Sequence, residues 1–254
     1  MKVSLLHRCT FGFLVTVTLL SAPSRADEAG PPEGFVSLFN GKDLQGWFGW
    51  GTQSPDALQA MTPEQLAEWK KRSIEGPLEG KNVGKELRKH WAVESGELVN
   101  DGEGLYATTD QDYGDFELWV DYKTVPEADS GIYLRGCPQV QIWDATQTDP
   151  RSVSIGKPLG SGGLWNNTAG TEGKDPLKKM DRPFGEWNEL RITMIGQRVT
   201  VIFNGEKVVD DAVMENYFDT TRRSPVPDKG PIQLQTHGGE IRWRNLWIRE
   251  IVAE

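Results

Sequence analysis

The chain has few of the side chains that crosslink a protein or hold zinc. Its 254 residues include two cysteines and three histidines. Cys9 lies in an N-terminal segment that we expect to be removed, which leaves Cys137 without a partner for an internal disulfide. The stability of the mature protein must then come from its hydrophobic core. The stretch 128–144 is expected to form two short strands joined by a tight Gly136-Cys137-Pro138 turn. Cys137 is expected to be a packed thiol, with a reactive thiol as the alternative.

The chain also lacks the sequence signatures of several common cofactor and nucleophile sites. The two histidines left after processing and one cysteine cannot supply an ordinary zinc site. No Gly-x-Ser-x-Gly elbow is present, and the glycine-rich stretch 160–167 has no phosphate-loop context. We interpret that stretch as a flexible loop over a cleft. No cofactor is predicted with certainty; a divalent cation such as calcium is compatible with the many acidic side chains, although no EF-hand spacing occurs.

No apolar run in the chain is long enough to span a bilayer as a helix. The run 11–20 follows the basic residues Lys2 and Arg8 and precedes a small-x-small site that ends at Ala26. We expect a signal peptide over 1–26 with cleavage after Ala26, a flexible leader over 27–33, and a single domain over 34–254. The mature protein is therefore predicted to be secreted or periplasmic.

Positive charge is also in short supply. The formal net charge is −9, and removal of the three basic residues of the signal peptide (Lys2, Arg8 and Arg25) moves it to −12. Such a balance disfavours nucleic acid and anionic membrane surfaces as partners. Ten tryptophans in an acidic, exported chain are compatible with binding of uncharged glycans.

The sequence is built mostly from short alternating segments between Gly, Pro, Asn and Asp. These segments predict about a dozen strands and an all-β sandwich. One region differs: Thr62, Pro63 and Gln65 form a capping signature for a helix over about 62–73. This helix lies in an insertion over about 50–90, which is either a lid or, as we favour, a decoration of the rim. The expected strands lie at 35–39, 91–99, 106–109, 116–122, 139–144, 189–195, 198–203, 206–209, 232–236 and 241–251.

One predicted strand carries an unusual polar face. Alternation along 139–144 places Gln139, Gln141 and Trp143 on one side, and Asp144 at the end of the strand. Amides and an indole side by side suit a sugar, because amides bind hydroxyls and an aromatic plane covers C–H faces. The alternative is the solvated outer face of a sheet.

Six motifs follow one another along the chain: 34–47, Asp129-Ser130-Gly131-Ile132-Tyr133-Leu134-Arg135, Val140-Gln141-Ile142-Trp143-Asp144, Gly185-Glu186-Trp187-Asn188, Phe203-Asn204-Gly205, and His237-Gly238-Gly239 with Trp243-Arg244-Asn245. Together and in this order they resemble the 3-keto-disaccharide hydrolase domain family. The similarity covers about residues 34–252 and implies a concanavalin A-like jelly-roll sandwich of two antiparallel sheets, here with a short helical insertion. It also implies action on glycosides whose sugar is oxidised at C3.

A 3-keto group makes the C2 hydrogen acidic, so a base can remove it and the C1 substituent leaves by β-elimination before water adds back. Asp144 is the expected base or metal-binding carboxylate, and Arg135 and His237 are expected to stabilise the enolate or transfer a proton. Each of the three has a structural alternative, such as a cap, a turn or an ion pair. The substrate-binding candidates are Gln139, Gln141, Trp143, Trp165, Gln233, Gln235 and Glu117, the last being also a possible ion-pair partner of Arg135.

The leading hypothesis is an exported enzyme that cleaves 3-keto-glycosides, with a carbohydrate as its partner. The main alternative is a non-catalytic, lectin-like carbohydrate-binding module of the same fold. A conventional glycosidase is less favoured, because the glutamate-rich motif of laminarinase-like enzymes starts at Glu127 but has Ile132 where its second glutamate should stand.

Overall fold

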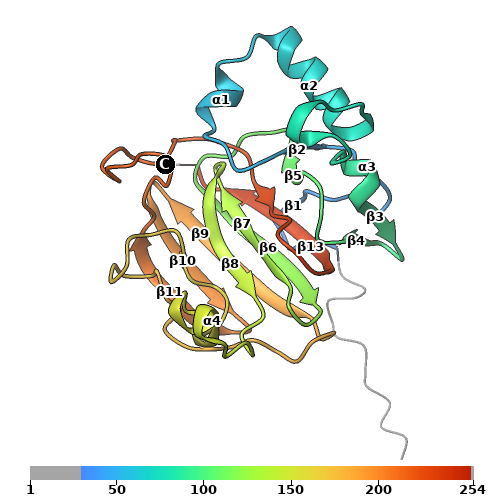
Figure 1. Ribbon diagram of the computed structural model, residues 1–254. Coiled ribbons are helices and arrows are strands. Elements are labelled where there is room, and N and C mark those ends of the chain that lie inside the picture. Colours follow the sequence, from blue (N-terminus) through green and yellow to red (C-terminus); the bar gives the residue numbers. More distant parts are fainter. Residues whose placement is uncertain (1–29, 253–254) are drawn as a thin grey trace, which may run out of the picture. The chain divides into compact units, whose positions relative to one another are not determined.

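Two antiparallel sheets form the framework of the computed structural model, which describes residues 30–252 (Figure 1). Within these residues the larger sheet has the strand order β11-β10-β9-β6-β13-β4-β3, with β1 paired to β13, and the smaller sheet has the order β2-β5-β12-β7-β8. The larger sheet comprises β1 (Val36–Ser37), β3 (Trp91–Glu94), β4 (Glu97–Asn100), β6 (Phe116–Thr124), β9 (Asn188–Ile195), β10 (Arg198–Phe203), β11 (Glu206–Val213) and β13 (Ile241–Glu250). The smaller sheet comprises β2 (Trp47–Trp50), β5 (Tyr106–Thr109), β7 (Asp129–Leu134), β8 (Cys137–Trp143) and β12 (Gln233–Leu234).

The two sheets enclose one hydrophobic core. Alternate residues of each strand point into it, as in β6, where Leu118 and Val120 are fully buried. From the smaller sheet Ile132, Val140 and Leu234 meet the same core cluster. A sheet that buries one face against another sheet leaves its second face for other contacts. The predicted all-β jelly-roll sandwich is thus confirmed.

The expected helix is present and is fixed to the edge of the smaller sheet. Helix α2 (Pro63–Glu75) starts with the predicted capping box between Thr62 and Gln65. Its Trp69 donates from Nε1 to Gly49 O over 2.9 Å, and Ser73 Oγ accepts from Gly49 N over 2.9 Å. The insertion therefore packs on β2 as a fixed wall. It also carries α1 (Asp56–Gln59), the 3-10 turn η1 (Gly80–Asn82) and α3 (Leu87–His90).

Cys137 lies at the first position of β8 and not in the β7–β8 turn, where the sequence pattern had placed it. The turn is formed by Arg135 and Gly136, both with positive φ. The Cys137 thiol is fully buried, and this burial raises its pKa to about 12. It is a packed core thiol with no cysteine partner among the described residues.

The predicted signal peptide, its cleavage point at Ala26 and residues 27–29 of the predicted leader lie outside the described residues. Residues 31–252 belong to one compact unit. In the part of the chain that the structure describes, no helix is both long enough and apolar enough to cross a membrane.

Candidate functional site

The polar face of the smaller sheet forms the floor of a cavity of about 600 Å³. We call this cavity the amide cleft. Strands β5, β7 and β8 and the segment after β12 contribute its floor, and the chain between β8 and β9 contributes one wall. Its main lining residues are Tyr106, Asp129, Tyr133, Gln139, Gln141, Trp143, Lys157, Trp165, Gln235 and His237.

Strand alternation explains which side chains reach the cleft. In β8, Val140 and Ile142 are fully buried in the sandwich core, so Gln139, Gln141 and Trp143 project to the opposite face. That is the predicted polar face, and it is neither solvated nor flat. All three side chains are at least nine-tenths buried.

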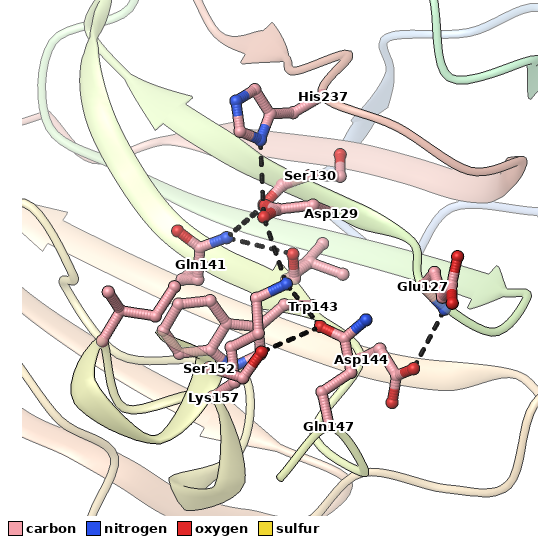
Figure 2. A network of polar contacts seen from close by, with 12 residues as sticks. Glu127, Asp129, Ser130, Gln141, Trp143, Asp144, Gln147, Ser152, Lys157 and His237 are labelled. Carbon is pink, nitrogen blue, oxygen red and sulfur yellow. Dashed lines mark hydrogen bonds and ion pairs between the residues drawn. The ribbon is translucent and has the colours of Figure 1, made fainter. Parts of the chain in front are cut away.

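The amides of the cleft form a continuous chain of hydrogen bonds that ends at a carboxylate, and Figure 2 shows the part from Gln141 to Asp129. Gln139 Nε2 donates to Gln141 Oε1 over 2.6 Å, and Gln141 Nε2 donates to Asp129 Oδ1 over 2.9 Å. Gly131 makes this arrangement possible, because a Cβ there would lie 2.5 Å from Gln139 Oε1. The side chains of β8 are therefore held flat across β7, and their orientation is set before any ligand binds.

The second oxygen of Asp129 faces two basic groups. Asp129 Oδ2 lies 3.4 Å from His237 Nδ1 and 3.7 Å from Lys157 Nζ. The backbone holds the first pair together, since Asp129 N donates to Gly238 O over 2.9 Å. The Asp129 carboxylate raises the pKa of His237, against the opposing effect of burial. The imidazole is 63 % exposed while the Asp129 side chain is 19 % exposed, so the imidazole is the member of the pair that a ligand can reach.

Lys157 reaches the cleft from the connection between β8 and β9. Helix α4 (Pro150–Ser154), capped by Asp149, leads into the 3-10 turn η2 (Lys157–Leu159). From there Lys157 Nζ donates to Gln147 Oε1 over 2.7 Å. A second cationic side chain, Arg151, lines the same wall. The cleft thus combines one carboxylate–imidazole pair with fixed positive charge.

Aromatic rings form the rest of the wall. Trp143 and Trp165 meet edge to face at 6.1 Å, and each indole N–H is held by a carbonyl, of Gly160 and Ile155 respectively. Tyr106 and Tyr133 form a second edge-to-face pair at 5.5 Å.

A third amide of the cleft contacts both tyrosines. Gln235 Nε2 donates to Tyr133 Oη over 3.4 Å and to Tyr106 Oη over 3.5 Å. Gln235 Oε1 and Gln139 Oε1 are buried and have no hydrogen-bond partner within residues 30–252. Burial also raises the pKa of Tyr133, so its hydroxyl stays protonated. Amides and phenol hydroxyls that line one cleft are suited to a ligand rich in hydroxyl groups.

The structure does not bring Asp144 into the amide cleft. It follows β8 as predicted, but it is buried, and Figure 2 shows its carboxylate turned toward Glu127. Asp144 Oδ2 accepts from Glu127 N over 2.9 Å, and Oδ1 accepts from both N and Oγ1 of Thr146. Although burial opposes it, these hydrogen bonds lower the pKa of Asp144. Asp144 is buried outside the cleft, and both of its oxygens accept hydrogen bonds, which corrects its expected role as the base of this cleft.

Arg135 is also placed elsewhere. Its guanidinium is 1 % exposed and crosses the end of the sandwich between the two sheets. It donates to the carbonyls of Gly114, Gly196 and Pro227 and to Asp115 Oδ1. All of these partners belong to loops at strand ends. Arg135 ties the loops together and does not line the cleft, which corrects its expected role at the enolate.

Two of the expected substrate-binding residues are likewise outside the cleft. Gln233 is fully buried, and its Nε2 donates to Thr108 Oγ1 over 3.1 Å. Glu117 lies on β6 of the larger sheet and pairs with Arg249, not with Arg135. The remaining candidates, namely Gln139, Gln141, Trp143, Trp165, Gln235 and His237, all line the cleft.

The sequence reasoning missed Asp129, Lys157, Tyr106 and Tyr133. Asp129 entered the sequence analysis only as part of a motif and not as a site residue, yet it starts β7 and pairs with Trp143 of β8. The available signal was strand alternation. Asp129 and Gly131 are two residues apart, so they lie on the same face of β7, the face that continues the Gln141 and Trp143 face of β8. Lys157 gave no signal, because its position depends on the path of a long connection. Within residues 30–252, no group of three or more His, Cys, Asp or Glu side chains is arranged to hold a metal ion.

Comparison with known proteins agrees with this architecture. Residues 34–249 match the 3-keto-alpha-glucoside-1,2-lyase-like domain. The chain belongs to this family. No curated protein matches the chain.

Solved structures give the same fold. One is the crystal structure of a "putative glycosyl hydrolase" from Parabacteroides distasonis, with a TM-score of 0.56, 22 % identity, and coverage of 87 % of this chain and 95 % of that chain. A second from the same organism has a TM-score of 0.54 and 23 % identity over 86 % of this chain and 84 % of that chain. A third has a TM-score of 0.50 and 26 % identity, covering 69 % of this chain and 98 % of that chain.

Proposed function

We propose that the protein cleaves glycosides of 3-keto sugars in the amide cleft. Family membership supports a protein that acts on or binds carbohydrate. The observation that carries the proposal is the bonded series Gln139–Gln141–Asp129–His237, which places a reachable imidazole at the end of a row of fixed amides. Amides and indoles would position the sugar, and the imidazole would carry out proton transfer.

His237 is the proposed base that removes the C2 proton. Its Nδ1 faces Asp129, so the proton on Nδ1 points to the carboxylate and Nε2 is left with a free lone pair. The same carboxylate stabilises the imidazolium that forms when Nε2 takes the proton. Asp129 is therefore a positioning residue, and it replaces Asp144 in the proposed site.

The electrons of the broken C2–H bond move onto the C3 oxygen and form an enolate. This charge needs donors that are already in place. Lys157 and the protonated phenol of Tyr133 line the cleft and are the proposed donors, in the role first given to Arg135. As the enolate collapses, the C1–O bond breaks and the leaving group departs as an alcohol after taking up a proton. Water then adds across the C1–C2 double bond, so the net reaction is hydrolysis.

The test is incubation with a matched pair of substrates, a 3-keto-glucoside and its unoxidised parent. The proposal predicts turnover of the keto compound alone, because only the keto group acidifies C2. Equal cleavage of both compounds would point to a conventional glycosidase and reject the enolate route. Binding of either sugar without turnover would favour the lectin-like module, which the amides and tryptophans of the cleft would also serve.

We also propose that the protein is exported, on the basis of the predicted signal peptide alone. Mass determination of the mature N-terminus after expression with the full leader tests this. A chain that begins at Asp27 and is recovered outside the cytoplasm is expected. Recovery of an uncleaved chain inside the cell would contradict it.

A further inference from the structure

A second cavity, of about 430 Å³, adjoins the amide cleft. Thr52, Tyr106 and His237 line both cavities, so the proposed base lies where they meet. C1, which carries the leaving group, is bonded directly to C2. When the sugar ring lies in the amide cleft with C2 at His237, the leaving group on C1 can therefore extend past His237 into the second cavity. We call it the lysine pocket.

The lysine pocket has a positive wall. Lys81 and Lys85, both exposed, line it from the insertion, and neither makes an ion pair or a side-chain hydrogen bond within residues 30–252. Glu103 is the acidic residue among its described lining. By contrast, many surface lysines of this acidic chain face a carboxylate, as in the pairs Lys123–Glu97 and Lys178–Glu206. Two unpaired ammonium groups beside the reaction centre favour an anionic ligand.

The floor of the pocket is fixed by close packing. Gly102 and Gly104 have φ of 94° and 90°, in the region that favours glycine. A Cβ at Gly102 would lie 2.5 Å from Gly239 N, and one at Gly104 would lie 2.6 Å from His90 Cδ2. Asn100 holds the same loop through Gly102 N and Glu103 O. The pocket is thus a built feature of the fold that only glycines permit.

We propose that the lysine pocket binds the leaving group of the glycoside and selects leaving groups that carry an anionic oxygen substituent, such as a carboxylate or a sulfate. This rests on the proposed function and names its substrate class. The sugar would lie against the amides, and the anionic group would lie against Lys81 and Lys85. The lysines act on binding, while proton transfer stays with His237.

The test compares 4-carboxyphenyl and 4-carbamoylphenyl 3-keto-glucosides, which have similar shape but differ in charge. The ratio of their kcat/KM values is measured in the wild type and in the double variant Lys81→Gln/Lys85→Gln. Two exposed ion pairs are lost in the variant, so the ratio is expected to fall roughly 3- to 30-fold. In the wild type the ratio should also fall as salt is added. The 4-sulfophenyl compound, whose sulfonate carries the same charge as a sulfate, should be preferred over the neutral compound in the same lysine-dependent way, and an absent preference would restrict the pocket to carboxylates.

The charge-matched control is Lys71→Gln/Lys229→Gln, which removes two exposed lysines outside both cavities and should leave the ratio unchanged. An unchanged ratio in the Lys81/Lys85 variant, with the neutral compound still turned over, overturns this inference and leaves the proposed function intact. If neither compound is turned over, the proposed function fails. In that case, calorimetric titration with the unoxidised 4-carboxyphenyl and 4-carbamoylphenyl glucosides tests whether the lysine pocket prefers an anionic ligand. Equal affinities overturn the inference. Tighter binding of the carboxylate that depends on Lys81 and Lys85 supports it.

Discussion

Replacement of Asp129 by asparagine tests how the proposed base is prepared for its task. Asp129 Oδ1 accepts from Gln141 Nε2 over 2.9 Å, and Oδ2 lies 3.4 Å from His237 Nδ1. In Asp129→Asn the oxygen of the new amide is expected to keep the bond from Gln141. Its NH2 group then faces His237 Nδ1 and donates to it. The proton of the imidazole moves to Nε2, and the atom proposed to accept the C2 proton is blocked.

The expected loss follows from what a general base contributes. General base catalysis is worth ~10²–10⁴-fold, so kcat/KM on a 3-keto-glucoside should fall by at least ~10²-fold. Stability should change little, because the bond from Gln141 survives and the 3.7 Å pair with Lys157 contributes at most about 1 kcal/mol. Urea denaturation and steady-state kinetics at one temperature measure both quantities.

The pH profile separates this role from a merely structural one. The Asp129 carboxylate raises the pKa of His237, and the neutral imidazole is the active form, so wild-type kcat/KM should rise with pH through that pKa. In Asp129→Asn the pKa is no longer raised, and the acidic limb of the residual activity should move to lower pH. Asp210→Asn, at an exposed position of β11 paired with Lys207, is the control. Wild-type activity in Asp129→Asn, or an unmoved acidic limb, would refute the reasoning.

Four further substitutions are expected to separate structural from functional residues. Asp144→Asn should cost about 1–2 kcal/mol of unfolding free energy, because the Asp144 oxygens accept local hydrogen bonds, and kcat/KM should stay within ~3-fold of wild type. A ~10²-fold loss of activity in a stably folded variant would return Asp144 to the site. Arg135→Lys should lower the free energy of unfolding, measured by urea denaturation, by about 3 kcal/mol, while the folded fraction keeps its activity. An unchanged free energy of unfolding would contradict the hydrogen bonds described for Arg135. Cys137→Ser should lower the free energy of unfolding by about 1–2 kcal/mol, because a buried hydroxyl replaces a packed thiol, and activity should be kept. Rapid labelling of the wild-type thiol in the native protein at neutral pH would contradict its burial and its pKa of about 12. Trp165→Ala should raise KM roughly 10-fold with kcat nearly unchanged, whereas an unchanged KM would place the sugar elsewhere.

The sequence was most informative where local alternation decides the outcome. The face shared by Gln139, Gln141 and Trp143 follows from the two-residue period of a strand, and the helix start at Thr62 follows from its own capping residues. Both are local properties, and both are confirmed in the structure.

Residue type alone was a poor guide to which charged groups are available for chemistry. Arg135 and Asp144 have the chemistry expected of a site, but other groups occupy their polar atoms. Carbonyls of distant loops accept from the Arg135 guanidinium, and Glu127 N and Thr146 donate to the Asp144 carboxylate. Asp129 and Lys157 approach each other through contacts between β7 and the long β8–β9 connection, separated by 28 positions in sequence. No spacing rule describes such contacts, because they depend on how the loops pack at the sheet edge.

The most direct test of the account is the rate with a 3-keto-glucoside deuterated at C2. If proton removal from C2 is the chemical step, the single-turnover rate constant should be clearly lower for the deuterated substrate than for the protiated one. Asp129→Asn, in which this step is the slowest, should show at least as large a difference. Equal rates for the two substrates in both enzymes, with turnover still dependent on the 3-keto group, would contradict removal of the C2 proton as the chemical step.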